Sequence, residues 1–209
     1  MKLYDCETAP SPRRVRIFIA EKGIELETVQ VDLGNGEHFS DEFQKINPDC
    51  TVPVLELDDG TCISEITPIC LYLEAKHPEP ALIGETDEER ATTLMWNQKV
   101  EQQGMMAMAD AFRNVAKGLA GRALPGPVNY EQIPALAERG RARVGNFLNR
   151  MNERLADNEF IAGNRFTIAD ITAMVTVDFA ARLKIVPADD AEHVKRWHAA
   201  VSSRPSASA

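Results

Sequence analysis

The order of the expected elements predicts an α/β domain followed by an all-helical domain. Up to about residue 76 the hydrophobic pattern follows the order βαβ and then ββα. Beyond residue 85 no segment has the pattern of a strand. A stretch rich in proline, glycine and acidic side chains separates the two patterns. We therefore expect one domain at residues 1–78, a linker at 79–85 and a helical bundle at 86–209.

The elements of the first domain each have a local signal. A helix is expected at 12–22, because Pro12 suits a first helical turn and Gly23 suits the position after the last one. Asp58-Asp59-Gly60 predicts a hairpin turn. The other expected elements are strands at 2–7 and 24–31, a short irregular or helical crossing at 38–46, hairpin strands at 52–57 and 61–63, and a helix that begins near Glu65.

The second domain reads as four helices. Thr86 and Glu89 have capping-box spacing and predict the start of a long helix that continues through Phe112. Leu124-Pro125-Gly126-Pro127 breaks the chain before a second amphipathic helix, and the last helix contains Trp197. The third helix, at 168–183, is apolar nearly all round and is expected at the centre of the bundle, with Thr167 and Asp170 as its capping box.

Composition restricts the kinds of function. The chain has 209 residues, a net charge of -9 and a pI near 5.0, which disfavours nucleic-acid binding. No apolar stretch has the length of a membrane span, so we expect a cytoplasmic protein. The four cysteines have no metal-ligand spacing, and we expect buried, reduced thiols and no metal. They are Cys6, Cys50, Cys62 and Cys70, of which Cys6 is a second-rank redox candidate.

A proline within a strand-like run and an acid at a helix start suggest a peptide site. Pro53 removes a ladder donor, so it belongs at an edge or a kink, often as a cis peptide whose neighbour keeps free backbone groups. Pro68 is tolerated only in a first turn, which sets Glu65 at the mouth of the next helix. A carboxylate beside unpaired N–H groups suits a ligand with both an ammonium and a carboxylate.

These motifs resemble the cytosolic glutathione S-transferase family, and the similarity covers nearly the whole chain. The strings that carry it are Leu3-Tyr4, Ala9-Pro10-Ser11-Pro12-Arg13-Arg14-Val15-Arg16, Glu21-Lys22-Gly23, Asn47-Pro48, Val52-Pro53-Val54-Leu55-Glu56, Ser64-Glu65 and Phe166-Thr167-Ile168-Ala169-Asp170. The resemblance implies a thioredoxin-like first domain, glutathione as co-substrate, a homodimer and a role in detoxification.

The residue that stabilises the glutathione thiolate is expected at the start of the first helix. Ser11 suits the N-cap before Pro12, and its hydroxyl proton is then free to donate; a cap without chemistry is an equal alternative. Thr8 is a reserve donor. Many relatives place the reactive side chain at the position of Ala9, which offers only its backbone, and the pattern is closer to bacterial Nu-class members, associated with disulfide reduction. Tyr4 is disfavoured because it falls on the other strand face.

The remaining groups of glutathione have partial matches. The resemblance implies that Val52 and Pro53 pair with the tripeptide backbone and that Glu65 holds its ammonium. His38 stands at the offset of a histidine that binds the glycine carboxylate in phi-class members. Thr51 and Ile66 replace more polar residues of the family and weaken the expected contacts. A solvated basic helix face is predicted for Arg13, Arg14 and Arg16. A mild positive field at the ligand site is the less favoured alternative.

The acceptor side is expected on the first long helix. Met105, Met108, Phe112 and Arg113 are candidates for an adaptable apolar pocket, although methionines at helical spacing are more often core. Three hypotheses therefore stand. The first is thiolate transfer to a hydrophobic electrophile, the second is glutathione-dependent reduction of a disulfide or peroxide, and the third is glutathione binding without catalysis.

Overall fold

The computed structural model describes residues 1–209 and divides into two compact units. The first contains residues 1–80, 124–129 and 208–209, and the second contains 81–123 and 130–207. The segment expected as a linker is therefore not a free connection. Residues 81–84 are buried, and the carbonyl of Leu82 accepts a hydrogen bond of 2.9 Å from the N–H of Ile168 within the second unit. Sequence reasoning missed this because Ala81-Leu82-Ile83 is too short for a periodic pattern.

The first unit has the expected βαβ and ββα order. Its sheet has the strand order β2-β1-β3-β4, in which β1 and β2 are parallel and β3 is antiparallel to both β1 and β4. The elements are β1 (Lys2–Asp5), α1 (Pro10–Lys22), β2 (Glu27–Gln30), η1 (Glu37–Phe39), α2 (Asp41–Ile46), β3 (Val54–Glu56), β4 (Cys62–Ser64) and α3 (Ile66–Lys76). The thioredoxin-like fold of this half is thereby confirmed.

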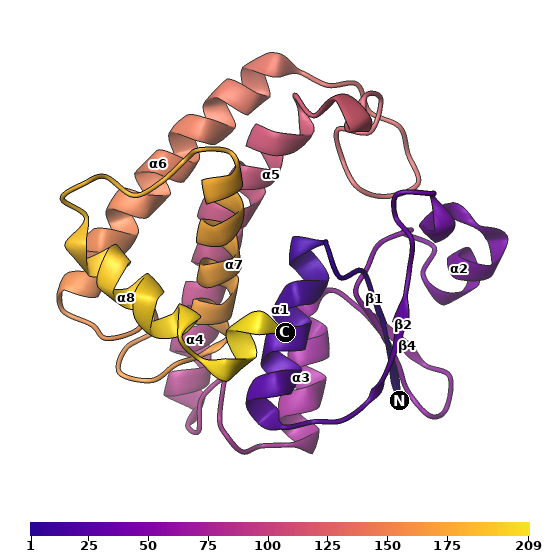
Figure 1. Cartoon of the computed structure of the whole chain (residues 1–209). Helices are drawn as coiled ribbons and strands as arrows, with labels where there is room; N and C mark the ends of the chain where they lie inside the picture. Colours follow the sequence, from indigo (N-terminus) through magenta and orange to yellow (C-terminus); the bar gives the residue numbers. More distant parts are fainter. The chain divides into compact units, whose positions relative to one another are not determined.

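The two faces of this sheet are covered by different helices. The α1 and α3 helices lie side by side on one face, and α2 lies on the other (Figure 1). Because side chains alternate along a strand, Tyr4 points to the α2 face, where it packs against Phe43, Val31 and Val54. Its hydroxyl donates to Glu56 Oε2 at 2.7 Å. Tyr4 is thus engaged on the face of the sheet opposite α1.

The second unit is entirely helical. The helix expected from Thr86 is confirmed, with Thr86 Oγ1 accepting from Glu89 N–H at 3.2 Å, but it contains one turn of π-helix at its centre. The elements are α4 (Asp87–Val100), the π turn η2 (Glu101–Met105), α5 (Met106–Arg113), η3 (Lys117–Leu119), α6 (Pro134–Ala156), α7 (Ile168–Arg182), α8 (Glu192–Ser202) and η4 (Pro205–Ser208).

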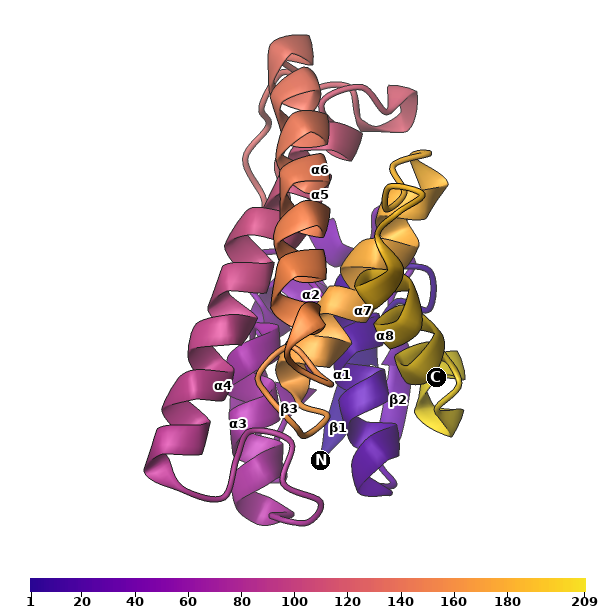
Figure 2. The ribbon, with the colours of Figure 1, turned by 90° about the vertical axis from the view of Figure 1, so that its left-hand side faces the viewer.

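Close helix packing organises this unit. The α6 helix runs along α5 (Figure 2), and Gly140 of α6 lies against the backbone of α5. Gly104 in the π turn leaves room for the Phe147 ring, because a Cβ at residue 104 would lie 2.7 Å from that ring. Small residues at these two points allow α6 to approach both α5 and the π turn closely.

The α7 helix is buried along most of its length, as its apolar pattern predicts. Its capping box is confirmed: the Thr167 N–H donates to Asp170 Oδ2 at 3.0 Å, and Thr167 Oγ1 accepts from the N–H of Ala169 at 3.3 Å. Asp170 is 0% exposed, so the cap is also part of the core. No helix of the structure combines the length and apolar character required to cross a bilayer.

Candidate functional site

Three predicted segments meet at one edge of the sheet. Tyr4 pairs with Val54, and Val54 pairs with Ser64, so these three residues form one row across β1, β3 and β4. The loop that leaves β1, the segment that enters β3 and the residue that follows β4 all lie just beyond this row. Because β1 and β4 run in the same direction, α1 and α3 both begin at this edge. The sheet register therefore brings the starts of both helices beside Val52.

The first turn of α1 differs from its prediction. The helix begins at Pro10 with Ala9 as the N-cap, so Ser11 is the second helical residue and does not act as the cap. The reason is that Pro10 also fits a first helical position and Ala9 adopts the extended conformation that an N-cap requires, with φ -89° and ψ 137°. Since Pro10 and Pro12 lack N–H groups, Ser11 carries the only backbone donor of the first three helical residues.

Ser11 has a buried cationic neighbour. Arg14 is 2% exposed, and its Nη2 donates to Ser11 Oγ at 3.2 Å. A hydroxyl that accepts from arginine keeps its own proton for another acceptor. The positive charge of Arg14 lowers the pKa of the Cys70 thiol on α3, against the larger effect of burial. The side of α1 that carries Arg14 therefore faces α3. Ser11 thus remains a hydroxyl donor candidate, although it is not a cap.

The expected solvated basic face on α1 is wrong for two of its three arginines. Arg14 is buried, and the Arg16 side chain is 17% exposed and forms an ion pair of 2.6 Å with Asp5. Asp5 itself is 1% exposed. The buried carboxylate of Asp5, the last residue of β1, explains why Arg16 turns inward, since buried charges require partners.

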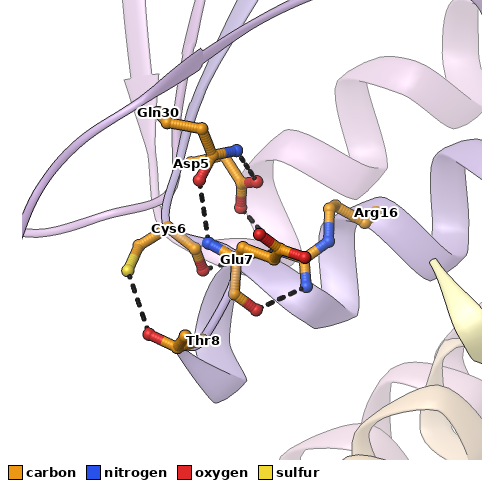
Figure 3. Close-up of polar contacts among 6 residues, drawn as sticks. All are labelled: Asp5, Cys6, Glu7, Thr8, Arg16 and Gln30. Atoms are coloured by element: carbon orange, nitrogen blue, oxygen red, sulfur yellow. Dashed lines mark hydrogen bonds and ion pairs between the residues drawn. The ribbon is translucent and has the colours of Figure 1, made fainter.

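The loop between β1 and α1, residues 6–9, is here called the entry loop. Thr8 is exposed, and its Oγ1 lies 3.5 Å from the Sγ of the buried Cys6 (Figure 3). The N–H of Ala9 donates to the Cys6 carbonyl at 3.0 Å. Ala9 was expected to offer its backbone to a ligand, but its N–H is already used within the loop. The hydroxyls of Thr8 and Ser11 are the side-chain donors that remain here.

The segment that enters β3 has the predicted geometry. The peptide between Val52 and Pro53 is cis. Asn47, which is 3% exposed, donates from Nδ2 to the carbonyl of Thr51 at 2.9 Å and to its Oγ1 at 3.0 Å. Val52 lies outside the ladder, which begins at Val54, and its backbone N–H and C=O form no hydrogen bond within the chain. Asn47 therefore fixes a short segment, bent at Val52, whose central peptide groups are open.

Glu65 occupies a strained position at the start of α3. It is the N-cap residue, with φ 70° and ψ 141°, a backbone conformation that side-chain-bearing residues rarely adopt. Its side chain is exposed and forms no cap hydrogen bond. Ile66 is 8% exposed and belongs to the core, so it offers only its N–H to a ligand. Strain of this kind persists where the surroundings fix it, and it is common in ligand sites.

His38 lies farther along the same edge. It is in η1, after the carboxyl end of β2, and β2 runs parallel to β1. The His38 ring is half-buried and lies 3.8 Å from the Phe39 ring, measured between centroids. Chain topology thus assigns His38 to the edge that carries Val52 and Glu65.

The predicted acceptor residues differ in their surroundings. Met105 is 5% exposed and Met108 is 1% exposed, so both belong to the core of the helical unit. The Phe112 ring packs edge-on against Phe179, and the Arg113 guanidinium donates to two backbone carbonyls, those of Ala123 and Arg122. A cavity of about 400 Å³ in this unit lies around Trp96, Val100 and Phe147, and none of the four residues lines it.

All four cysteines are free thiols, but one differs from the prediction. Cys6, Cys50 and Cys70 are buried, whereas Cys62 is exposed because it lies on β4, an edge strand. Burial raises the pKa of the Cys70 thiol. No group of three or more His, Cys, Asp or Glu side chains is arranged to hold a metal ion.

Proteins of known family resemble this chain over its full length. Residues 8–76 match the family model described as glutathione S-transferase, N-terminal domain, and residues 108–205 match glutathione S-transferase, C-terminal domain. Glutathione S-transferase 2 of Saccharomyces cerevisiae is 34% identical over 99% of this chain and 87% of its own length. The disulfide-bond oxidoreductase YfcG of Escherichia coli is 28% identical over 97% of this chain and 92% of its own length.

Solved structures agree with the sequence matches. A glutathione S-transferase domain-containing protein from Marinobacter aquaeolei is 41% identical, with a TM-score of 0.91 over 99% of both chains. Gtt2 from Saccharomyces cerevisiae is 33% identical, with a TM-score of 0.90 over 99% of this chain and 98% of its own. The fold, the two family models and these relatives agree, and the chain belongs to the glutathione S-transferase family.

Proposed function

We propose that the protein binds reduced glutathione at the edge of the sheet and transfers its thiolate to electrophilic small molecules. The observation that carries this proposal is the convergence of the α1 start, the open peptide groups of Val52 and the strained Glu65 at one edge. Val52 pairs with the tripeptide backbone, and Glu65 takes its ammonium group. The sulfur lies at the first turn of α1. His38 and Thr51 are the candidates for the glycine carboxylate.

The energy needed to form a thiolate assigns a role to Ser11. A free cysteine thiol titrates near 8.5, and lowering that pKa by about two units requires roughly 2.7 kcal/mol of preferential thiolate stabilisation. A helix start usually supplies only about 0.3 to 1 kcal/mol, and the first turn of α1 carries one backbone N–H in three residues. A hydrogen bond to a charged group adds about 1.5 to 3 kcal/mol. We assign that bond to the Ser11 hydroxyl, because it accepts from Arg14 and so keeps its own proton to donate.

Substitution of the two hydroxyls tests this role. In Ser11→Ala we expect kcat for conjugation of a chlorinated nitroarene to fall by about tenfold to a hundredfold, the value of one hydrogen bond to a charged group. In Thr8→Val we expect a loss of less than about threefold, as for a donor outside the reacting geometry. Glutathione affinity, measured by calorimetry, should change little in either variant. A larger loss in Thr8→Val than in Ser11→Ala would transfer the donor role to Thr8.

A second candidate function is glutathione-dependent disulfide reduction. It is favoured by the similarity to the disulfide-bond oxidoreductase YfcG, and by the Thr8-Ala9-Pro10-Ser11 loop, which resembles that of Nu-class members. Turnover of a mixed disulfide without conjugation of a nitroarene would favour this reaction. Binding of glutathione without either turnover would favour a non-catalytic binding protein.

The assembly and location follow from the same proposal. We expect a homodimer that acts in the cytoplasm and serves detoxification, as the family resemblance implies. Light scattering of the purified protein would measure the dimer directly.

A further inference from the structure

A closed ring of hydrogen bonds includes the backbone of Glu7 in the entry loop (Figure 3). Asp5 Oδ1 accepts from Arg16 Nη1 at 2.6 Å, and Arg16 Nη2 donates to the Glu7 carbonyl at 3.0 Å. The Glu7 N–H donates to Gln30 Oε1 at 2.9 Å, and Gln30 Nε2 donates to Asp5 Oδ2 at 2.5 Å. Both backbone groups of Glu7 are therefore held, one by α1 and one by β2.

The sheet register explains why these side chains meet. Asp5 is paired with Gln30 in the parallel ladder of β1 and β2, so their side chains are neighbours on one face of the sheet. Asp5 is 1% exposed, and its two oxygens each accept from a different partner. A planar guanidinium held at one end by a buried carboxylate has its remaining donors in fixed directions. One such donor of Arg16 also reaches the Cys6 carbonyl at 3.4 Å.

We propose that Arg16 is a positioning residue for the glutathione sulfur. Through its contacts with the carbonyls of Cys6 and Glu7, and with Gln30 as the second support, it fixes the entry loop and hence the first turn of α1, which carries Ser11. The inference rests on the proposed function, because it assigns the sulfur to that turn. Stabilisation of a developing or resting anion depends on donors that are already in place before the ligand arrives. Arg16 itself does not touch the substrate.

Two variants separate positioning from simple stabilisation of the fold. Arg16→Lys keeps the charge beside Asp5 but loses the fork that reaches two carbonyls. Gln30→Ala removes the support of the Glu7 N–H at an exposed residue, so the protein should fold normally. Thr28→Ala, an exposed change on the same strand, is the matched control.

The measurements are kcat, KM for glutathione, and the pKa of enzyme-bound glutathione from its thiolate absorbance. We expect kcat to fall by about tenfold in Arg16→Lys and about threefold in Gln30→Ala, with KM within about twofold of wild type, because binding groups stay in place while alignment is lost. The bound thiol pKa should rise in both variants. Thr28→Ala should behave as wild type.

The possible outcomes distinguish this inference from the proposed function. If the wild-type protein binds glutathione with a lowered thiol pKa but both variants keep that pKa and kcat, the positioning role is wrong and the proposed function stands. If Arg16→Lys alone keeps the wild-type kcat and bound thiol pKa, the ion pair with Asp5 serves the fold and the fork of Arg16 has no positioning role. If the wild-type protein does not bind glutathione, both the inference and the proposed function are overturned.

Discussion

Replacing Asp170 by alanine is expected to lower the free energy of unfolding by about 3–5 kcal/mol, as for the removal of one partner from a buried charged network. Asp170 accepts four hydrogen bonds: from Ile161 N–H and Trp197 Nε1 at its Oδ1, and from the N–H and hydroxyl of Thr167 at its Oδ2. Burial raises the pKa of Asp170 to about 6, while these donors act in the opposite direction. The carboxylate is therefore ionised at neutral pH, and its loss leaves several buried donors without partners.

Two further variants make this result specific. Asp170→Asn keeps the shape but turns an amide NH₂ toward donors, so we expect an intermediate loss. Asp189→Ala, at an exposed position, should change the free energy of unfolding by less than about 0.5 kcal/mol. Denaturant unfolding measures all three. A loss below about 1 kcal/mol in Asp170→Ala would contradict the central role of this cap.

Gly140→Ala is expected to destabilise the protein by about 2–3 kcal/mol through overpacking. A Cβ at this position would lie 2.6 Å from the Ala107 carbonyl oxygen and 2.6 Å from the Ala111 nitrogen. Both are backbone atoms of α5, so a change of rotamer cannot relieve the contact. The α5 and α6 helices would have to move apart, which loses packing along their whole interface.

Gly145 in the same helix provides the matched control. A Cβ at residue 145 meets no atom within 4 Å, so Gly145→Ala should raise the free energy of unfolding by about 0.5–1 kcal/mol through helix propensity alone. We therefore expect Gly140→Ala to lower the free energy of unfolding and Gly145→Ala to raise it. Equal effects at both positions would show that the close approach of α5 and α6 does not limit stability.

Local sequence signals predicted features of both units. The cis peptide before Pro53, the start of α3 after Glu65 and the cap at Thr167 each depend on a few neighbouring residues, and all three are present. The predicted start of α1 was two residues too late, because Pro10 and Pro12 both fit a first helical turn. Cap preference favoured Ser11, yet the extended backbone of Ala9 decides where the helix begins.

Features that depend on tertiary contacts escaped prediction. Arg16 looks like a surface charge in the sequence, and its inward turn requires the pairing of Asp5 with Gln30, which only the strand register provides. Met105 and Met108, by contrast, are buried, as the more common role of methionines at helical spacing predicts. Helical spacing alone does not distinguish a core methionine from one that lines a pocket.

The central claim is that a glutathione thiolate is held at the first turn of α1. The most direct test is the pH titration of thiolate absorbance for glutathione bound to the purified protein. We predict that the bound thiol titrates near pH 6.5, about two units below a free cysteine thiol. A bound thiol that titrates near 8.5, or no binding at millimolar glutathione, would contradict the claim.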